Sequence, residues 1–272
     1  MNLHVDRYGY TGAGASALPL LLIHGWAMHG GMWSAVAQRL AQHSDVLAVD
    51  LPGHGYSVGR DSSRQGCNVG MNPDLHLDAI VEHLSAQFDG PLNVCGWSLG
   101  GQVAMRWAML RPQQVQRLML VASTPCFVRR EGWDHAVSVE ILLEFGSALQ
   151  HHYALTLKRF LALQLRGGEQ ERELLAVLRD ALFSRGEPDL DALQQGLGIL
   201  RDCDLRSALP SITQPALVVA GGRDALVPLQ ASQYMARLLP AAELVNIEAA
   251  AHAPFMSHAD IFVKHIVRFL HG

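Results

Sequence analysis

The sequence is poor in cysteine and has no long apolar run. Its four cysteines, Cys67, Cys95, Cys126 and Cys203, are scattered without a CxxC pair, which excludes a disulfide framework and indicates reduced thiols. No stretch of 18 apolar residues occurs, so no membrane-spanning helix is predicted. The first residues, MNLHVDRYGYTGAG, lack the basic-then-apolar order of a secretory signal. We therefore expect a cytoplasmic protein that does not bind membranes.

An excess of positive charge is also missing. Lysine and arginine total 21 against 25 aspartate and glutamate residues, a formal net charge of −4, which argues against nucleic-acid binding. The 14 histidines include no HExxH, and we interpret His151-His152 as a solvated pair. Gly12-Ala-Gly14 lacks the third glycine of a phosphate-binding loop. We expect no metal and no cofactor, and a monomer.

What the sequence does contain is a series of short, wholly apolar runs separated by helical patterns. Continuous apolar runs are typical of strands buried on both faces of a sheet. The alternation of strand and helix predicts an α/β fold with a mostly parallel central sheet covered by helices. The expected strands are an N-terminal one, 19–24, 46–49, 92–95, 118–121, 216–220 and 244–247, and the expected helices of this core are 32–42, 74–88, 102–110 and 261–270.

The alternation stops after residue 124. From about 125 to 204 no strand pattern appears, and four segments, 142–149, 155–165, 174–183 and 190–200, have helical apolar spacing. We therefore predict a core formed by residues 1–124 and 205–272, interrupted by a helical cap at 125–204 that covers a site. The alternative is a second helical layer with no functional role.

Gly96-Trp97-Ser98-Leu99-Gly100 matches the G-x-S-x-G nucleophile elbow. It lies between an expected buried strand and an expected helix, which is the context that the motif requires. Glycines on either side of the serine let neighbouring backbone approach closely. The pattern predicts that Ser98 is a nucleophile and that the Leu99 N–H binds an oxyanion.

A serine nucleophile needs an adjacent base, and in this fold the acid and then the histidine follow the serine along the chain. Asp224 follows the expected strand 216–220, and His252 follows the next one. We predict that His252 is the base and that Asp224 orients it. The competing residues are His258, Asp202 and Asp204, whereas Asp50 is interpreted as bracing the segment 51–55.

The second oxyanion donor is expected after an earlier strand. In His24-Gly25-Trp26 the glycine permits a turn that aims the Trp26 N–H at the site. The Trp26 indole is open to two interpretations, as core filling or as a wall of the acyl pocket.

These motifs, in this order along the chain, resemble the α/β-hydrolase superfamily. The segments Gly96–Gly101, 121–127, 159–164 and 251–258 further resemble the carboxylesterases that act on pimeloyl-[acyl-carrier protein] methyl ester in biotin synthesis. The resemblance implies a methyl ester substrate on acyl-carrier protein. It also implies that an FLALQ run lines the acyl channel, here Phe160, Leu161, Ala162, Leu163 and Gln164.

An acidic carrier protein would require a local basic patch, because this chain is acidic overall. The predicted cap contains several arginines, and Arg159, Arg166 and Arg172 are the preferred carrier contacts because they flank the FLALQ run. Interleaved glutamates are equally consistent with an ordinary solvated helix face. The polar segment 58–72 departs from the family by its length.

Two other functions use the same parts. One is hydrolysis of a short-chain ester, a lactone or a carbon–carbon bond by the same triad. The other is a ligand receptor of this fold with weak or no catalysis. A dehalogenase is disfavoured, because that chemistry places an aspartate at the position of Ser98.

Overall fold

A computed structural model describes residues 2–12, 17–58 and 76–272 of the chain. Its centre is a seven-stranded sheet in the order β1-β3-β2-β4-β5-β6-β7. The strands are β1 (Val5–Tyr8), β2 (Ala17–Ile23), β3 (Ser44–Val49), β4 (Leu92–Trp97), β5 (Val115–Val121), β6 (Ala216–Gly221) and β7 (Ala242–Ile247).

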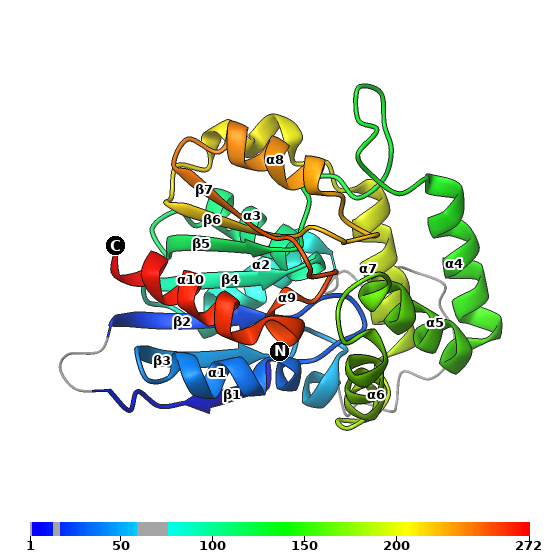
Figure 1. The fold of residues 1–272 in the computed structure, drawn as a ribbon, viewed down its shortest axis with the longest axis horizontal. Helices are drawn as coiled ribbons and strands as arrows, with labels where there is room; N and C mark the ends of the chain where they lie inside the picture. The colour runs from blue at the N-terminus through cyan, green and yellow to red at the C-terminus, as the bar shows by residue number, and fades with distance from the viewer. Residues whose placement is uncertain (1, 13–16, 59–75) are drawn as a thin grey trace.

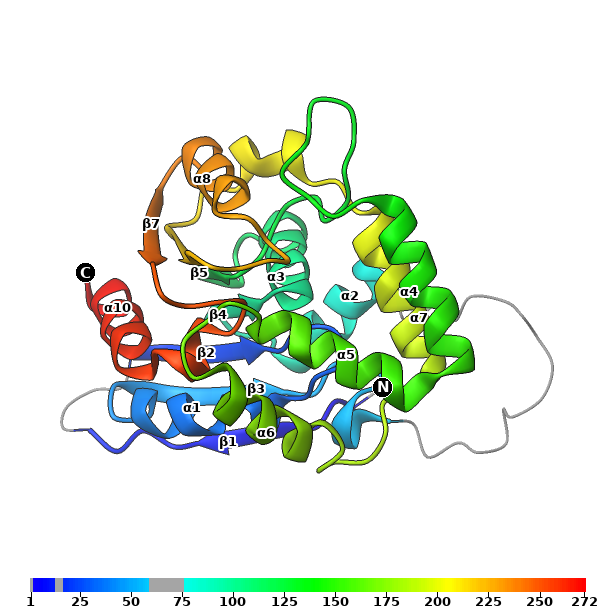
Figure 2. The ribbon, with the colours of Figure 1, turned by 45° about the vertical axis from the view of Figure 1, so that its right-hand side comes forward.

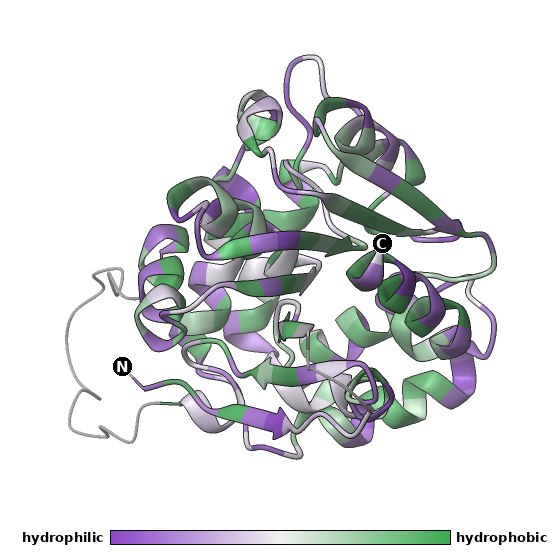
Figure 3. Ribbon diagram, turned by 90° about the vertical axis from the view of Figure 1, so that its left-hand side faces the viewer, coloured by the Kyte–Doolittle hydropathy of each residue, from purple (hydrophilic) through white to green (hydrophobic). Residues whose placement is uncertain are grey.

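All neighbouring strands from β3 to β7 run parallel, and β1 alone pairs antiparallel, with Val5 opposite Val49 at the edge. Every residue of β4 and β6 is buried, as their continuous apolar sequences predict. Figure 3 shows the strands as mainly hydrophobic and the surrounding helices as mixed. The predicted fold class is confirmed.

Helices cover both faces of the sheet (Figure 1). Helices α1 (Ser34–Leu40) and α10 (Ala259–His271) pack together on one face, beside the short α9 (Pro254–Ser257). Helices α2 (Leu77–Gln87) and α3 (Leu99–Leu110) pack together on the other, while α8 (Leu229–Leu238) packs on β6 and β7. The sequence patterns did not identify α8 or α9.

Four further helices lie between β5 and β6: α4 (Val139–His151), α5 (Tyr153–Leu165), α6 (Glu171–Leu182) and α7 (Leu190–Asp202). They gather at one end of the sheet (Figures 1 and 2). Residues 125–204 are called the cap below. The chain enters and leaves the cap side by side, because Cys126 and Asp204 form an antiparallel bridge.

Two further sequence-based expectations concern a membrane-spanning helix and the polar segment 58–72. Within the part of the chain that the structure describes, no helix has the length and apolar character needed to cross a membrane. Apart from Val58, the polar segment 58–72 lies outside the described residues.

Candidate active site

Ser98 stands at a sharp turn between the end of β4 and the start of α3. Its backbone angles are φ 55° and ψ −118°, a conformation that a residue with a side chain rarely adopts. The turn is fixed on both sides, because the Ser98 N–H donates to the Val121 carbonyl (2.9 Å) and the Ser123 hydroxyl donates to the Ser98 carbonyl (2.8 Å). The backbone of Ser98 is therefore held in one position at the carboxyl edge of the sheet, from which its side chain projects.

The two flanking glycines are required by close backbone contacts. A Cβ at Gly96 would lie 2.2 Å from the Gly100 carbonyl oxygen, and a Cβ at Gly100 would lie 2.5 Å from the Ile23 carbonyl oxygen. Neither position tolerates a side chain without movement of the main chain. The G-x-S-x-G spacing thus follows from the packing of the elbow on β2.

Asp224 and His252 lie together in the loops that follow β6 and β7. The His252 Nδ1 and Asp224 Oδ2 atoms are 2.7 Å apart, and both side chains are 1% exposed. The other carboxylate oxygen, Oδ1, accepts the N–H groups of Leu226 (2.8 Å) and Val227 (3.0 Å). With its proton held on Nδ1 by the carboxylate, neutral His252 keeps Nε2 as an acceptor.

The main chain of His252 is held from two sides. Its N–H donates to the Gln164 carbonyl in α5 (3.0 Å), and its carbonyl accepts the indole N–H of Trp97 (2.8 Å). Trp97 immediately precedes Ser98, and its ring centroid is 5.9 Å from that of His252. The histidine loop is therefore fixed beside the elbow and beneath the cap. Trp97 was not identified from sequence, although its place inside the elbow motif was the available signal.

The loop after β2 lies against the elbow. A Cβ at Gly25 would be 3.3 Å from the Ser98 Cβ, and Met28 N–H closes a turn onto the Gly25 carbonyl (3.2 Å). His24 fixes this loop, because its Nε2 accepts the Leu51 N–H (2.9 Å) and its Nδ1 donates to the Gly25 carbonyl (2.8 Å). Burial, with a smaller contribution from His54, lowers the His24 pKa well below its usual value, which keeps the ring neutral.

Trp26 joins the core to the cap. Its indole N–H donates to the Leu193 carbonyl in α7 (2.8 Å), and its ring packs edge-on against Phe160 (4.9 Å) and Phe145 (5.5 Å). A Cβ at Gly196 would lie 2.7 Å from the indole, so α7 passes directly over it. Phe145 and Gly196 were not identified from sequence, where nothing distinguishes them from other apolar or small helix residues.

The five side chains of the FLALQ run point in different directions around helix α5. Leu161 and Gln164 are buried, Phe160 and Ala162 are half-buried, and Leu163 is 36% exposed. Five consecutive helix residues cannot share one face, because each is rotated by about 100° from the last. Both polar atoms of the Gln164 amide are buried without a hydrogen-bond partner among the residues that the structure describes.

The three arginines expected to contact a carrier protein, Arg159, Arg166 and Arg172, are exposed on the cap. Other cap arginines are engaged internally. Arg130 donates to the Arg201 carbonyl (2.8 Å), and Arg185 donates to the Asp50 carboxylate (3.1 Å). The basic surface is therefore smaller than the arginine content of the cap suggests.

The competing acids and bases lie in other interactions. His258 contacts the Ser257 hydroxyl (2.9 Å), and Asp202 and Asp204 are paired with the guanidinium groups of Arg201 and Arg206 (2.7 Å each). Asp50 accepts the Tyr56 N–H (2.8 Å), which agrees with a bracing role for the segment that follows it.

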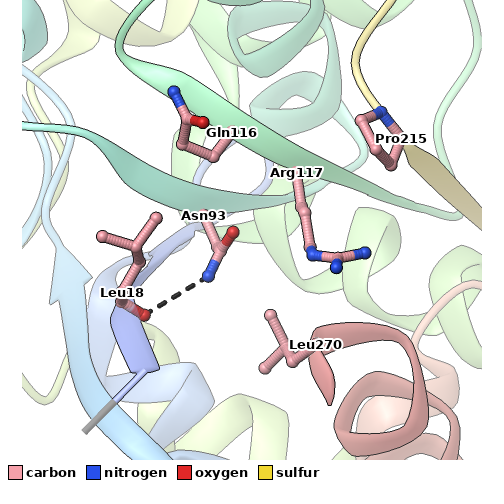
Figure 4. A pocket seen from close by; sticks show the side chains of 6 residues that line it. All are labelled: Leu18, Asn93, Gln116, Arg117, Pro215 and Leu270. Carbon is pink, nitrogen blue, oxygen red and sulfur yellow. Dashed lines mark hydrogen bonds between the residues drawn. The ribbon is translucent and has the colours of Figure 1, made fainter. Parts of the chain in front are cut away.

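No group of three His, Cys, Asp or Glu side chains arranged to hold a metal ion is found among residues 2–12, 17–58 and 76–272. A surface hollow lined by Leu18, Asn93, Gln116, Arg117, Pro215 and Leu270 lies at the amino ends of the strands (Figure 4). Ligands of open α/β sheets bind at the carboxyl ends, where Ser98 and His252 lie. The hollow is therefore separate from the candidate site.

Comparison with known proteins places the chain. Residues 19–259 match the alpha/beta hydrolase fold family. The chain is 42% identical over 264 residues to the pimeloyl-[acyl-carrier protein] methyl ester esterase of Nitrosomonas europaea, covering 97% of both chains. It is also 42% identical over 268 residues to the esterase of the same name from Xanthomonas oryzae pv. oryzae, covering 98% of both.

Among solved structures, the esterase EaEST from Exiguobacterium antarcticum superposes with a TM-score of 0.83. The alignment covers 99% of this chain and 96% of that one at 19% identity, which shows a shared fold. The chain belongs to the alpha/beta hydrolase fold family and, within it, to the family of the pimeloyl-[acyl-carrier protein] methyl ester esterases.

Proposed function

We propose that this protein is a serine carboxylesterase that hydrolyses pimeloyl-[acyl-carrier protein] methyl ester in biotin synthesis. The observation that carries the proposal is the 42% identity to esterases of that name over nearly the full length, cap included. Because the cap supplies Phe145 and Phe160, which pack on Trp26 beside the elbow, similarity that extends through the cap supports a shared substrate.

In the proposed reaction, the Ser98 hydroxyl attacks the ester carbonyl while His252 Nε2 removes its proton. Asp224, hydrogen-bonded to Nδ1 at 2.7 Å, stabilises the imidazolium that forms. The positive end of α3, which begins at Leu99, favours negative charge at this position. The proposal assigns these three side chains the roles of nucleophile, base and orienting acid.

The tetrahedral oxyanion is proposed to lie between the main-chain N–H groups of Trp26 and Leu99. His252 then donates its proton to the departing methanol, which leaves the acyl group on Ser98. A water molecule, deprotonated by His252, attacks the acyl-enzyme and releases the free carboxylate. One ester and one water thus give one acid and one methanol, with no redox step.

The acyl chain is proposed to run along the aromatic wall formed by Trp26, Phe145 and Phe160. Ring centroids in this wall lie 4.9–5.8 Å apart. Such a surface offers an apolar path for methylene groups leading away from the half-buried Ser98. Residues 125–204 act as a cap in this proposal, because α4, α5 and α7 supply or support the wall.

The carrier protein would dock at the outer end of that path. The proposed contacts are Arg159, Arg166 and Arg172, which are exposed on the cap and whose positive charge would suit an acidic carrier protein. Charged rims of this kind steer association and orient the partner more than they add affinity.

Purified protein assayed on pimeloyl-[acyl-carrier protein] methyl ester tests the proposal directly, with methanol release as the readout. Wild-type protein is expected to release methanol, and Ser98→Ala is expected to lose nearly all turnover while keeping a native circular dichroism spectrum. The control variant is Ser211→Ala, an exposed serine whose hydroxyl donates to the Ala208 carbonyl (2.7 Å).

Complementation gives the cellular counterpart. A biotin auxotroph that lacks its own methyl ester esterase should grow when it expresses wild-type protein and not when it expresses Ser98→Ala. Esterase activity on p-nitrophenyl esters without growth would instead favour a broader esterase, and tight ligand binding without turnover would favour a receptor.

A further inference from the structure

A second contact between cap and core lies at the turn between α6 and α7. Arg185 in this turn has a side chain that is only 12% exposed. Its guanidinium bonds both oxygens of Asp50 at 3.1 Å, and it also bonds the Asp6 carboxylate. The guanidinium lies over the Tyr56 ring, 5.1 Å from the centroid.

The Asp50 carboxylate is a rigid part of the core. It is fully buried, and it accepts the N–H groups of Gly30 (2.6 Å) and Tyr56 (2.8 Å) in addition to Arg185. A Cβ at Gly31 would lie 2.7 Å from an Arg185 nitrogen, so the core leaves space for the guanidinium at this point. Because Nη1 of Arg185 bonds Asp50 and Nη2 bonds Asp6, the guanidinium is held between two carboxylates and specifies one position for the turn.

His29 adds an uncharged bond beside this pair. Its Nδ1 accepts the Gly31 N–H (3.1 Å), so Nε2 carries the proton and donates to the Ala181 carbonyl at the end of α6 (2.8 Å). Burial lowers the His29 pKa, and the nearby Arg185 charge lowers it further, which keeps the ring neutral. The end of α6 and the turn after it are thus both attached to the core.

The attachment continues into α7. The Asp189 N–H donates to the Gly53 carbonyl (2.8 Å), and the Asp189 carboxylate caps α7 by accepting the N–H groups of Asp191 (2.8 Å) and Ala192 (3.2 Å). Leu193, the residue that follows Ala192, accepts the indole N–H of Trp26 at its carbonyl. Arg185 therefore lies a few residues before the helix that contacts Trp26. The loop after β2 that carries Trp26 is called the oxyanion loop below, because the Trp26 N–H is a proposed oxyanion donor.

We propose that Arg185 is a positioning residue: its guanidinium, held by Asp6 and Asp50, sets α7 over Trp26 and so keeps the oxyanion loop in its reactive geometry. This inference rests on the proposed esterase function. It assigns the ion pair a role in turnover as well as in attaching the cap.

Three variants test the inference by steady-state hydrolysis of p-nitrophenyl acetate and p-nitrophenyl butyrate. Arg185→Met removes the charge, and Arg185→Lys keeps the charge but cannot bond both carboxylates through a fork. Arg201→Gln is the matched control, since its exposed pair with Asp202 (2.7 Å) also lies on the cap. All assays are run well below the melting temperature measured for each variant.

The expected result is a fall in kcat of about tenfold for Arg185→Met and a smaller fall for Arg185→Lys, equal for both esters and with little change in KM. Arg201→Gln should keep the wild-type kcat. A role in stability alone would lower the melting temperature and leave kcat unchanged, and that result would overturn the inference. If Arg185→Met does not fold, the kcat of Arg185→Lys decides.

The two proposals fail in different ways. Ser98→Ala that keeps wild-type turnover would reject the esterase mechanism, whatever Arg185 does. An inactive Ser98→Ala together with folded Arg185 variants of wild-type kcat would reject only the positioning role.

Discussion

Replacing Gly196 by alanine adds one methyl group where α7 passes over the Trp26 indole. The new Cβ would lie 2.7 Å from the Trp26 Cδ1 atom and 3.1 Å from Nε1. Carbon atoms in contact are about 3.5 Å apart, so either the indole or the helix must move by about 0.8 Å. A displacement of that size at a reacting group costs up to about 10²-fold in rate, and we expect kcat to fall about 10- to 100-fold.

Stability should respond far less, because two effects oppose each other. Alanine in place of glycine inside a helix stabilises by about 1 kcal/mol. Overpacking against the indole destabilises by about 1–3 kcal/mol. The free energy of unfolding is therefore expected to fall by no more than about 2 kcal/mol, which lowers the melting temperature by a few degrees.

Gly198 provides the matched control two residues further along α7. Among the described residues, a Cβ there would meet nothing within 4 Å outside its own helix, so Gly198→Ala gains helix propensity without a new packing contact. Steady-state kinetics on p-nitrophenyl butyrate and thermal unfolding by circular dichroism compare the two variants. Equal kcat values for Gly196→Ala and Gly198→Ala would refute the reasoning that α7 sets the position of Trp26.

Asp224→Asn should lower kcat about 10⁴-fold, because an amide can hold His252 in the wrong tautomer, and a loss of less than tenfold in single-turnover assays would contradict the assigned role. Burial lowers the pKa of His24, His29 and His54 below the ordinary 6.5. Below pH 6.5 the unfolded chain then binds more protons than the folded one. The free energy of unfolding should therefore decrease as the pH is lowered, by up to about 1.4 kcal/mol per pH unit for each histidine. Urea titrations measure this slope, and stability that stays constant down to about pH 5 would count against it. Changing Arg159, Arg166 and Arg172 together to glutamine should raise KM for the carrier-bound ester but not for p-nitrophenyl acetate. At about 0.5 M salt the KM difference between variant and wild type should be smaller, because salt screens the charges. An equal rise in KM for both esters would contradict the docking role.

The sheet and the elbow were readable from the sequence because both are encoded locally. Buried parallel strands leave continuous apolar runs, and β4 and β6 extend only a residue or two beyond the runs that predicted them. The glycines around Ser98 are required by contacts within the elbow and with β2, so the motif itself carries the geometry. Helix α8 lacked a comparable signal, since its first turns contain small and polar residues.

The attachment of the cap could not be read in the same way. Arg185 is one of many cap arginines, and its partners Asp6 and Asp50 lie 179 and 135 residues away in the chain. The bond from His252 to Gln164 uses a main-chain carbonyl, which every residue possesses. Contacts of this kind depend on how the chain is folded and leave no mark on residue type.

That use of main-chain acceptors has a consequence for how the cap can vary. Core residues donate hydrogen bonds to main-chain carbonyls of the cap. His252 donates to Gln164 and His29 to Ala181. Trp26 donates to Leu193 and Arg223 to Gly167. A helix keeps its carbonyls whatever side chains it carries. Apart from positions such as Gly196 and Arg185, which meet the core directly, residues along the proposed acyl path can therefore change while these main-chain bonds are kept.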